Sequence, residues 1–476
     1  MSIAVRLKRH GTPPKIGIVH FGPGAFFRAF NAVYTHEAMA RSGGDWGILA
    51  VSLKSSTARD QLLPQGCVYT SVTRAQSGNR HGIITSVADV KVAPDHPIAV
   101  LDVMTNPAVK IVSLTITEKG YCHEPSTGRL NLAHPDIVHD LAHPDAPRTA
   151  IGFIVAALAR RRHKGHCGFT VLSCDNLPAN GKLVRGVVLE FAGLVDVELA
   201  NWIERNTSFP STMVDRITPA TTPADVADLD AETGYHDPAC VVHEAFRQWV
   251  IEDDFVGGRP AWEAAGAQYV TSVDAHETMK LRCLNGTHST LAYLGYLAGH
   301  ETISDCVADP DFASLCEKLW HHEIIPTLQQ PDGEDLKVYC ARLLERYRDT
   351  AIRHRTWQIA MDGSQKLPQR ILGTIADNLV EGIVPSGLCL VVAAWMRYIG
   401  GLDEKGGAID VRDPLADRLK QVNDEASDKV VALLAMEELF PGSLATDPRF
   451  GAAVAAAYQQ LIDVGAKASV REYVSA

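Results

Sequence analysis

Three side chains whose chemistry suits reversible alcohol oxidation lie close together in MKLRCLNGTHSTLAYLGYLAG: Lys280, Asn285 and His288. That reaction needs a group that takes the hydroxyl proton, donors for the oxygen as it gains charge, and a hydride acceptor. A lysine, an asparagine and a histidine supply the first two without a metal. Helical periodicity predicts that the three side chains project at about 0°, 140° and 80°, so that His288 lies between the other two.

The spacing of these residues leaves two interpretations open. A lysine acts as a base only where burial and neighbouring positive charge lower its pKa towards neutrality. In an arbitrary helix, Lys280 would be a surface charge, Asn285 a local hydrogen-bonding group and His288 a satisfied interior residue. Gly286 favours the catalytic interpretation, because a glycine within a helix costs about 1 kcal/mol and indicates close packing or the approach of a ligand.

A pair of glycines near the N-terminus could hold the phosphates of a dinucleotide. HFGPGAFFRA places Gly22 and Gly24 between a predicted strand and a predicted helix, where backbone amides can bind a pyrophosphate. The third glycine of the GxGxxG pattern is missing, because Phe27 stands in its place. From these residues alone, a dinucleotide site and a turn with purely steric glycines both remain open.

The residues after the second predicted strand bear on the choice of nicotinamide cofactor. A carboxylate there would bind the adenosine ribose and repel a 2′-phosphate. This chain has Lys54 and Ser55 at the end of the strand, then Arg59, and the first acid after the strand is Asp60. The two basic residues are either partners for a 2′-phosphate or ordinary solvated charges. We therefore expect NAD and do not exclude NADP.

The elements that must position these residues change character along the chain. Short β-branched runs alternate with helical stretches in the first part, as is typical of a parallel sheet with crossover helices. These runs are IGIVHF at 16–21, WGILAVSL at 46–53, VKIVSLTIT at 109–117 and GFTVLSCDN at 168–176. After Met279 the pattern becomes that of long amphipathic helices broken by proline and glycine.

We therefore expect an α/β protein with two domains. Residues 1–270 would form an expanded Rossmann domain that binds the dinucleotide. Residues 280–476 would form a mainly α-helical substrate and catalytic domain. The active site would lie between the two domains, because such clefts exclude water and fix geometry.

Composition excludes several classes of partner. The chain has 45 basic and 56 acidic residues, a net charge of −11, and no basic block that could follow a nucleic acid or an anionic membrane. Its ten cysteines show no CxxC pair or zinc-ligand spacing, which is typical of reduced thiols. No signal peptide or membrane span is evident. We expect a cytoplasmic protein, monomeric or weakly oligomeric, that acts on a small molecule.

Six ordered motifs resemble those of the polyol-specific long-chain dehydrogenases, the mannitol dehydrogenase family, over nearly the whole chain. They are TITEKGY at 115–121, SCDN at 173–176, MVDRITP at 213–219, FRQWVIED at 246–253, KLRCLNGTHS at 280–289 and DGSQKLP at 362–368. Six motifs in order are far more specific than a glycine turn. The resemblance implies a metal-independent dehydrogenase acting on CH–OH donors.

The resemblance also implies roles for individual residues. Lys280 would be the general acid/base, Asn285 and Asn176 would form an oxyanion hole, and His288 would orient the substrate. Glu118 would lie on a proton relay, although a capping or ion-pairing carboxylate is as good an interpretation. Asp215, in MVDRITP, would bind substrate hydroxyls. The candidate cofactor-binding residues are Gly22, Gly24, Phe26, Arg28, Ser55 and Glu118.

The segment HRTWQIAMDGSQKLPQR at 354–370 most resembles the branch that interconverts D-mannonate and D-fructuronate. Mannitol-type members generally carry an arginine where this chain has Gln358, and Lys366 matches a lysine at the substrate end. Arg353 and Arg355 lie near in sequence, and such cations could bind a sugar-acid carboxylate or simply be solvated. Gln358 and Lys366 are therefore candidate substrate-binding residues.

Two departures from the family pattern affect the cofactor end. The family's FHRAHQ is FFRAFN here, so both histidines are replaced, by Phe27 and Phe30, and Thr57 stands where an acid is usual. We expect fructuronate reductase activity. The alternatives are a mannitol, sorbitol or arabinitol dehydrogenase with the same chemistry, and a nucleotide-sensing protein that kept the fold without catalysis.

Overall fold

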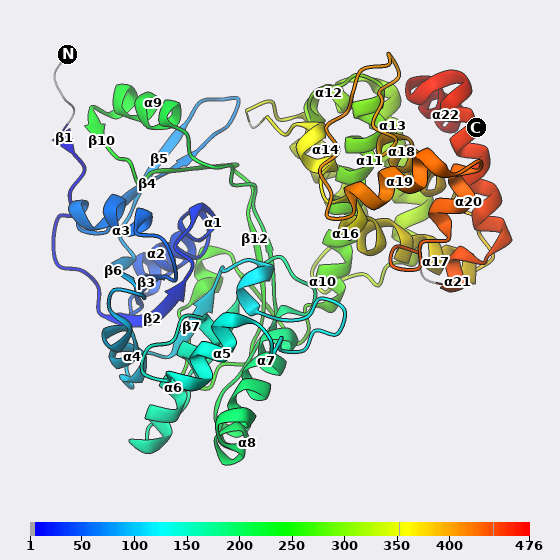
Figure 1. Ribbon diagram of the computed structural model, residues 1–476. Coiled ribbons are helices and arrows are strands. Elements are labelled where there is room, and N and C mark those ends of the chain that lie inside the picture. Colours follow the sequence, from blue (N-terminus) through cyan, green and yellow to red (C-terminus); the bar gives the residue numbers. More distant parts are fainter. Residues whose placement is uncertain (1–4, 352, 441) are drawn as a thin grey trace. The chain divides into compact units, whose positions relative to one another are not determined.

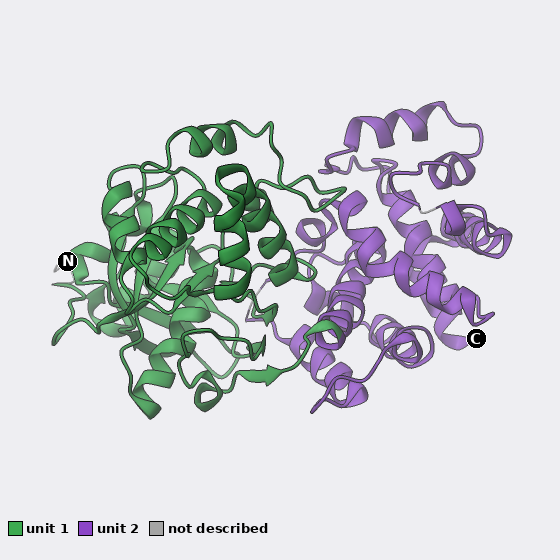
Figure 2. Ribbon diagram, turned by 90° about the horizontal axis from the view of Figure 1, so that it is seen from below, with its two compact units in different colours: residues 1–274 green, residues 275–476 purple. Residues whose placement is uncertain are grey.

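The computed structural model describes residues 5–351, 353–440 and 442–476. The chain forms two compact units, residues 1–274 and residues 275–476, which Figure 2 shows in different colours. The first unit contains every strand of the described chain, and the second is helical in its described part. An α/β protein with a Rossmann-type N-terminal part and a helical C-terminal part is confirmed.

A parallel five-stranded sheet forms the centre of unit 1 (Figure 1). Its strand order is β6-β3-β2-β7-β8, and every neighbouring pair is parallel. The bounds are β2 Ile16–Phe21, β3 Gly47–Ser52, β6 Val87–Val92, β7 Ile111–Leu114 and β8 Thr170–Ser173. Four of these strands lie within the runs predicted from sequence.

Alternating side chains of the sheet enter two different cores. Val19, Leu49 and Val112 pack with α4, α6, α7 and α8 on one face, whereas Ile18 and Ile111 pack with α1 and α2 on the other. Both faces are therefore buried, as expected for parallel strands. The helices of this unit are α1 Ala25–Ala29, α2 Asn31–Ser42, α3 Thr57–Leu62, α4 Pro97–Thr105, α5 Pro135–Ala142, α6 Ala150–His163, α7 Asn180–Val195, α8 Val197–Asn206 and α9 Pro223–Thr233.

Three smaller sheets extend unit 1 beyond the central sheet. Strand β4 pairs with β5 and β11, β12 pairs with β9 and β13, and β1 pairs with β10. Their bounds are β1 Val5–Arg6, β4 Tyr69–Thr73, β5 Arg80–Ile84, β9 Thr212–Asp215, β10 Tyr235–His236, β11 Val241–His243, β12 Gln248–Glu252 and β13 Gln268–Val270.

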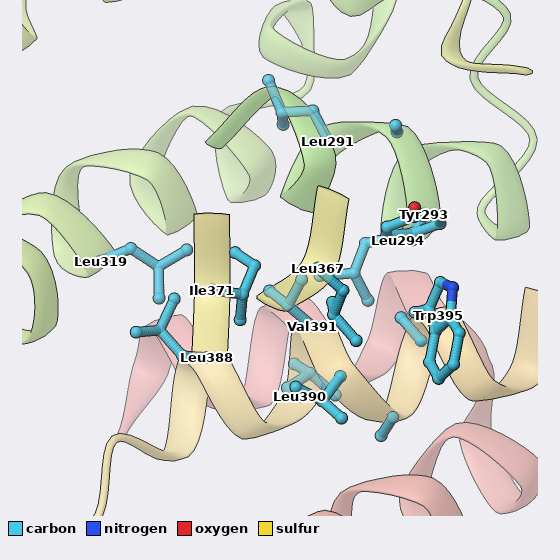
Figure 3. Packing of buried hydrophobic residues seen from close by; sticks show 14 of the residues in the cluster. Leu291, Tyr293, Leu294, Leu319, Leu367, Ile371, Leu388, Leu390, Val391 and Trp395 are labelled. Atoms are coloured by element: carbon cyan, nitrogen blue, oxygen red, sulfur yellow. The ribbon is translucent and has the colours of Figure 1, made fainter. Parts of the chain in front are cut away.

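Unit 2 is built from helices around one large hydrophobic core. Figure 3 shows Leu294 of α11, Leu367 at the end of α16 and Val391 of α18 meeting in this core. The longer helices are α11 Gly286–Leu297, α13 Pro310–Leu319, α14 Leu336–Arg348, α17 Gly373–Val380, α18 Ser386–Tyr398, α19 Ala416–Glu425 and α22 Pro448–Ser475. The shorter ones are α10 Asp274–Met279, α12 Ile303–Ala308, α15 Thr356–Ala360, α16 Gly363–Leu367, α20 Lys429–Leu434 and α21 Gly442–Ala445.

In the described part of unit 2, three π-helical turns interrupt the helices: Lys280–Asn285, Trp320–Ile324 and Pro368–Leu372. Such turns are rare and occur often at functional sites. Across the described ranges, no helix is long and apolar enough to cross a membrane. Within the same ranges, no cluster of three or more His, Cys, Asp or Glu side chains is arranged to hold a metal ion.

Candidate active site

The candidate residues of unit 1 gather at the carboxyl edge of the central sheet. Gly22 and Gly24 follow β2, Ser55 follows β3, Glu118 follows β7 and Asn176 follows β8. The chain runs outward from β2 to β3 and β6, then returns to β7 on the other side of β2. The glycine turn therefore lies at the topological switch point, where open α/β sheets bind their ligands.

The backbone requires a glycine at position 22. Gly22 has a φ of +94°, and an added Cβ would lie 2.0 Å from the Thr115 carbonyl oxygen. Its N–H donates to the Val51 carbonyl, and its own carbonyl accepts from the Thr115 hydroxyl at 2.7 Å. The turn is thus fixed to both neighbouring strands. Gly24 is exposed, and an added Cβ there would come no closer than 4.0 Å to another atom, the Gly22 carbonyl oxygen.

An aromatic cluster replaces the two histidines that the family pattern leads one to expect. Phe27 stacks on His20 with ring centroids 3.8 Å apart, and Phe30 stacks on Phe26 at 4.9 Å. Burial lowers the pKa of His20 to about 3, so this ring is neutral. Its Nδ1 lies 2.8 Å from the Ser113 hydroxyl. The neutral ring and its phenylalanine neighbours thus form the apolar support beneath the glycine turn.

Of the other candidates near this turn, Phe26 is half-buried and Arg28 is buried. Arg28 Nη1 donates to the Ala239 carbonyl at 2.7 Å, and the Arg28 carbonyl accepts from the Tyr69 hydroxyl at 2.6 Å. These bonds connect α1 to β4 and to the residues before β11. These hydrogen bonds give Arg28 a structural role. A contact between Arg28 and a cofactor stays a prediction.

The carboxyl end of β3 carries an ion-pair group that the sequence did not indicate. Arg59 lies 2.8 Å from Asp95, which follows β6, and 2.9 Å from Asp60. The Ser56 hydroxyl also donates to Asp60, and Ser55 is exposed, with its Oγ 2.7 Å from Thr57 Oγ1. Two carboxylates therefore flank Arg59, which could have met a 2′-phosphate.

Asp175 fixes the loop that carries Glu118. Its carboxylate accepts from the N–H groups of Ile116 and Thr117 at 3.0 and 2.9 Å, and from the Tyr121 hydroxyl at 2.7 Å. Thr117 has a φ of +64°, a strained conformation that is typical of functional loops. Burial raises the pKa of Asp175, although these donors oppose the shift. Glu118 is exposed in this rigid loop.

The remaining candidates of unit 1 lie on β9 and after β8. Asn176 is exposed next to Asp175, and Asn180 ties the segment to β9 by donating to the Asp175 and Thr212 carbonyls. Asp215 is buried at the end of β9. The two predicted residues are thus carried by neighbouring, hydrogen-bonded segments of the same unit.

In unit 2, the predicted α-helical projection of Lys280, Asn285 and His288 is wrong. Residues 280–285 form a π-helical turn, and the Gly286 N–H donates to the Leu281 carbonyl five residues back. Because hydrogen bonds in such a turn connect residues five apart, Lys280 and Asn285 come closer to one face than an α-helix would allow. Lys280 is buried, whereas Asn285 and His288 are half-buried.

Distant aromatic residues stabilise this π-helical turn. Trp320 Nε1 donates to the Cys283 carbonyl at 3.0 Å, and the Tyr347 hydroxyl donates to the Leu284 carbonyl at 3.0 Å. The Thr287 hydroxyl lies 2.8 Å from that of Tyr347. These partners satisfy carbonyl groups within the wider turn, so its geometry is set by residues on other helices.

His288 is held neutral among positive charges. Burial is the main cause of a pKa well below the usual value, and His354, Arg346, Arg370 and Lys280 add to it. The ring lies 4.8 Å from that of Tyr347, and its Nε2 is buried without a hydrogen-bond partner among the described residues. A neutral imidazole with one unused nitrogen suits a residue that orients a hydroxyl group.

The candidate Lys366 of α16 is held by the end of α15. Its Nζ donates to the Ile359 and Met361 carbonyls at 3.2 and 2.5 Å. Burial, with the charge of Arg370, lowers its pKa to about 8. Gln358 is exposed on α15. Two backbone carbonyl groups thus hold the ammonium group of Lys366. The roles of Lys366 and Gln358 towards a substrate stay predictions.

Sequence reasoning missed Arg370, which lies against the π-helical turn. Its Nη1 is 3.2 Å from the Ser289 hydroxyl and 3.5 Å from the Asn285 carbonyl. Gly286 permits this approach, because an added Cβ would lie 3.1 Å from the Arg370 carbonyl. Close packing, one of the two expectations for Gly286, is therefore observed. The lysine motif gave no signal for Arg370, which lies 85 residues beyond Asn285.

The hydroxyl of Tyr347 is expected to contribute measurably to stability. Tyr347→Phe removes the bonds to Leu284 and Thr287 and should lower the free energy of unfolding by about 1–3 kcal/mol. Tyr398→Phe is the matched control, because the Tyr398 hydroxyl is buried without a partner among the described residues. Urea unfolding of both variants checks this. An equal loss of stability in the two would contradict the assigned bonds.

Comparison with known proteins covers both units. Residues 16–264 match the family model described as the mannitol dehydrogenase Rossmann domain, and residues 272–462 match the mannitol dehydrogenase C-terminal domain. The chain is 47% identical to the D-mannonate oxidoreductase of Escherichia coli K12 over 463 residues, 95% of this chain and 94% of that protein.

Two similarities concern mannitol 2-dehydrogenases. The protein of Pyrenophora tritici-repentis is 39% identical over 473 residues, 98% of this chain and 83% of its own length. The solved structure of Pseudomonas fluorescens mannitol 2-dehydrogenase, a ternary complex with NAD and D-mannitol, is 39% identical with a TM-score of 0.86. It covers 99% of this chain and 97% of its own.

Proposed function

The chain is an oxidoreductase of the mannitol dehydrogenase family, and from that premise we propose that it interconverts D-mannonate and D-fructuronate with NAD(H). The observation that carries the proposal is the π-helical turn, which brings Lys280 and Asn285 towards one face beside the neutral His288. The 47% identity to D-mannonate oxidoreductase supports a sugar acid as the substrate.

In the proposed reaction, Lys280 takes the proton of the substrate hydroxyl as the carbinol C–H bond breaks and the C=O bond forms. Asn285 and Asn176 donate hydrogen bonds to that oxygen, and His288 orients a neighbouring hydroxyl through its unused Nε2. In reduction, Lys280 returns the proton. The nicotinamide cofactor, when bound, accepts the hydride from the carbinol carbon or returns it to the carbonyl carbon.

The carboxyl edge of the central sheet fits such a cofactor. Gly22 is the residue that the turn requires, and Gly24 is the exposed N-cap of α1, so the first N–H groups of that helix begin at the switch point. Phe26, Ser55 and Glu118 lie around the same edge, half-buried or exposed. We propose these residues, with Arg28 supporting α1 from below, as the cofactor-binding set.

The ion pairs of Arg59 favour NAD over NADP. Asp60 and Asp95 neutralise Arg59, and both would repel a 2′-phosphate. The double variant Asp60→Asn/Asp95→Asn should raise kcat/KM with NADPH relative to NADH at least several-fold. Glu263→Gln, which removes an exposed carboxylate that pairs with Arg259, is the control and should leave the ratio unchanged. An unchanged ratio in the double variant would show that these acids do not select the cofactor.

Steady-state kinetics test the substrate assignment. Reduction of D-fructuronate and of D-fructose by NADH should give a kcat/KM at least tenfold higher for the acid, since a charged group adds about 1.5–3 kcal/mol of hydrogen bonding. A preference for D-fructose would overturn the assignment in favour of the second candidate, a mannitol-type dehydrogenase. The 39% identity to mannitol 2-dehydrogenases supports that candidate.

A further inference from the structure

Side chains bind a backbone carbonyl in the middle of the π-helical turn Lys280–Asn285. The Cys283 carbonyl accepts from Trp320 Nε1 at 3.0 Å and from the Thr287 hydroxyl at 2.5 Å. Such donors compete with the N–H group four residues later and distort a helix locally. Thr287 belongs to α11, which continues the turn, whereas Trp320 lies on a separate helical segment. Trp320 therefore ties the turn to another part of unit 2.

Trp320 begins a second π-helical turn, Trp320–Ile324, which Glu323 fixes to the start of α18. The buried Glu323 carboxylate accepts from the N–H groups of Gly387 and Leu388, each at 2.8 Å. The first N–H groups of a helix have no partner within that helix, and a negative charge there also meets the positive end of the helix dipole. Glu323 thus caps α18 and fastens the turn that bears Trp320.

The last helix, α22, binds the same carboxylate. The Tyr473 hydroxyl donates to Glu323 Oε1 at 2.9 Å. Gly387 leaves room for this phenol, because an added Cβ there would lie 2.5 Å from its hydroxyl oxygen. Lys318 Nζ donates to the Tyr473 carbonyl at 2.7 Å and lies 4.7 Å from the centroid of its ring. Both α18 and α22 therefore hold the segment from which the indole of Trp320 extends.

The bond from Trp320 to Cys283 affects how Lys280 and Asn285 are arranged. In an ordinary α-helical turn these two side chains would project about 140° apart. The wider turn brings them towards one face, and the indole N–H helps to keep it wide. Proton transfer needs the base within hydrogen-bond reach of the hydroxyl, and a displacement of about 1 Å can cost on the order of 100-fold in rate.

We propose that Trp320, anchored by Glu323, is a positioning residue that keeps Lys280 and Asn285 on one face of the π-helical turn and so sets the rate of proton transfer. The inference rests on the proposed function, which makes Lys280 the acid/base. Trp320 acts through the backbone of Cys283 and needs no contact with the substrate.

Trp320→Phe tests this role, with whichever of D-fructuronate and D-fructose the unmodified protein reduces faster. The variant keeps an aromatic ring and loses the N–H donor. Its kcat should fall about 10- to 100-fold, while KM and the Kd for NADH stay within about twofold. Trp395→Phe is the matched control, because Trp395 is also buried in unit 2 (Figure 3) and its Nε1 has no partner among the described residues. It should lose similar stability in urea and keep its kcat.

Glu323→Gln tests the anchor without a change of core volume. An amide cannot accept from both N–H groups of α18 as the carboxylate does, so kcat should fall about 3- to 10-fold. Glu317→Gln, exposed on α13, is its control and should keep full activity. In Trp320→Phe and Glu323→Gln, the rate should also be more sensitive to D₂O than in the unmodified protein, because proton transfer becomes slower relative to the other steps.

Equal falls in kcat for Trp320→Phe and Trp395→Phe, or losses that appear in KM, would overturn the inference and leave Trp320 a purely structural role. An unchanged sensitivity to D₂O would overturn it as well. Lys280→Ala separates these results from a failure of the proposed function. Retained turnover in Lys280→Ala would refute the acid/base and the inference together. Loss of turnover in Lys280→Ala with full turnover in Trp320→Phe would refute the role of Trp320 alone.

Discussion

Replacing Lys280 by alanine is expected to lower kcat about 10²- to 10⁴-fold in both directions, because the variant loses its proton acceptor and donor. Lys280 is buried at the start of the π-helical turn. The loss should fall on kcat, while NADH binding, followed by its fluorescence, should stay within about twofold, since the carboxyl edge of unit 1 is untouched.

Lys420→Ala is the control for this variant, because Lys420 is exposed on α19 in the same unit and pairs with Asp424. It should keep full activity. Lys366→Met is a sharper comparison, because Lys366 is half-buried and has a pKa lowered to about 8. A larger fall in kcat for Lys366→Met than for Lys280→Ala would make Lys366 the base. Unchanged turnover in Lys280→Ala would show that Lys280 is not the catalytic acid/base.

Replacing Gly22 by alanine is expected to remove cofactor binding and to destabilise unit 1. A positive φ alone costs an L-residue about 1–2 kcal/mol. Here the new Cβ would also lie 2.0 Å from the Thr115 carbonyl oxygen, so the backbone of β2 or of the loop after β7 must shift. That shift moves the amides at the switch point, and the Kd for NADH should rise at least tenfold.

Gly78→Ala is the matched control for Gly22→Ala. Gly78 has a φ of +108° in the hairpin between β4 and β5, and an added Cβ would meet nothing within 4 Å. The Gly78→Ala variant should therefore lose only the stability that a positive φ costs an L-residue, and its Kd for NADH should be unchanged. Calorimetric titration of both variants checks the difference. If Gly22→Ala bound NADH as the unmodified chain does, the glycine turn would not be the phosphate site.

The central sheet was predictable from the sequence, because parallel strands buried on both faces appear as continuous apolar runs. The run at 16–21 coincides with β2, and the others contain β3, β7 and β8. The family resemblance, inferred from six motifs, is also confirmed. The sequence did not show why position 22 must be a glycine, because the Thr115 carbonyl approaches Gly22 only in the folded chain.

The error at Lys280–Asn285 has a physical cause. Sequence periodicity assumes 3.6 residues per turn, whereas this turn is π-helical and is stabilised by Trp320 and Tyr347 from other helices. No local pattern reveals such partners. Arg370 was missed for a similar reason. Arg353 and Arg355 stand near the substrate motif in sequence, but tertiary packing brings Arg370 to the lysine turn.

The most direct test of the central claim follows the hydride itself. D-Fructuronate is reduced with NADH that carries deuterium at both positions of C4 of the nicotinamide, and the product is analysed by mass spectrometry. The account predicts one deuterium per product molecule on the new carbinol carbon, and none when unlabelled NADH is used in D₂O. A product without label from the cofactor, or with carbon-bound label from the solvent, would contradict hydride transfer by this protein.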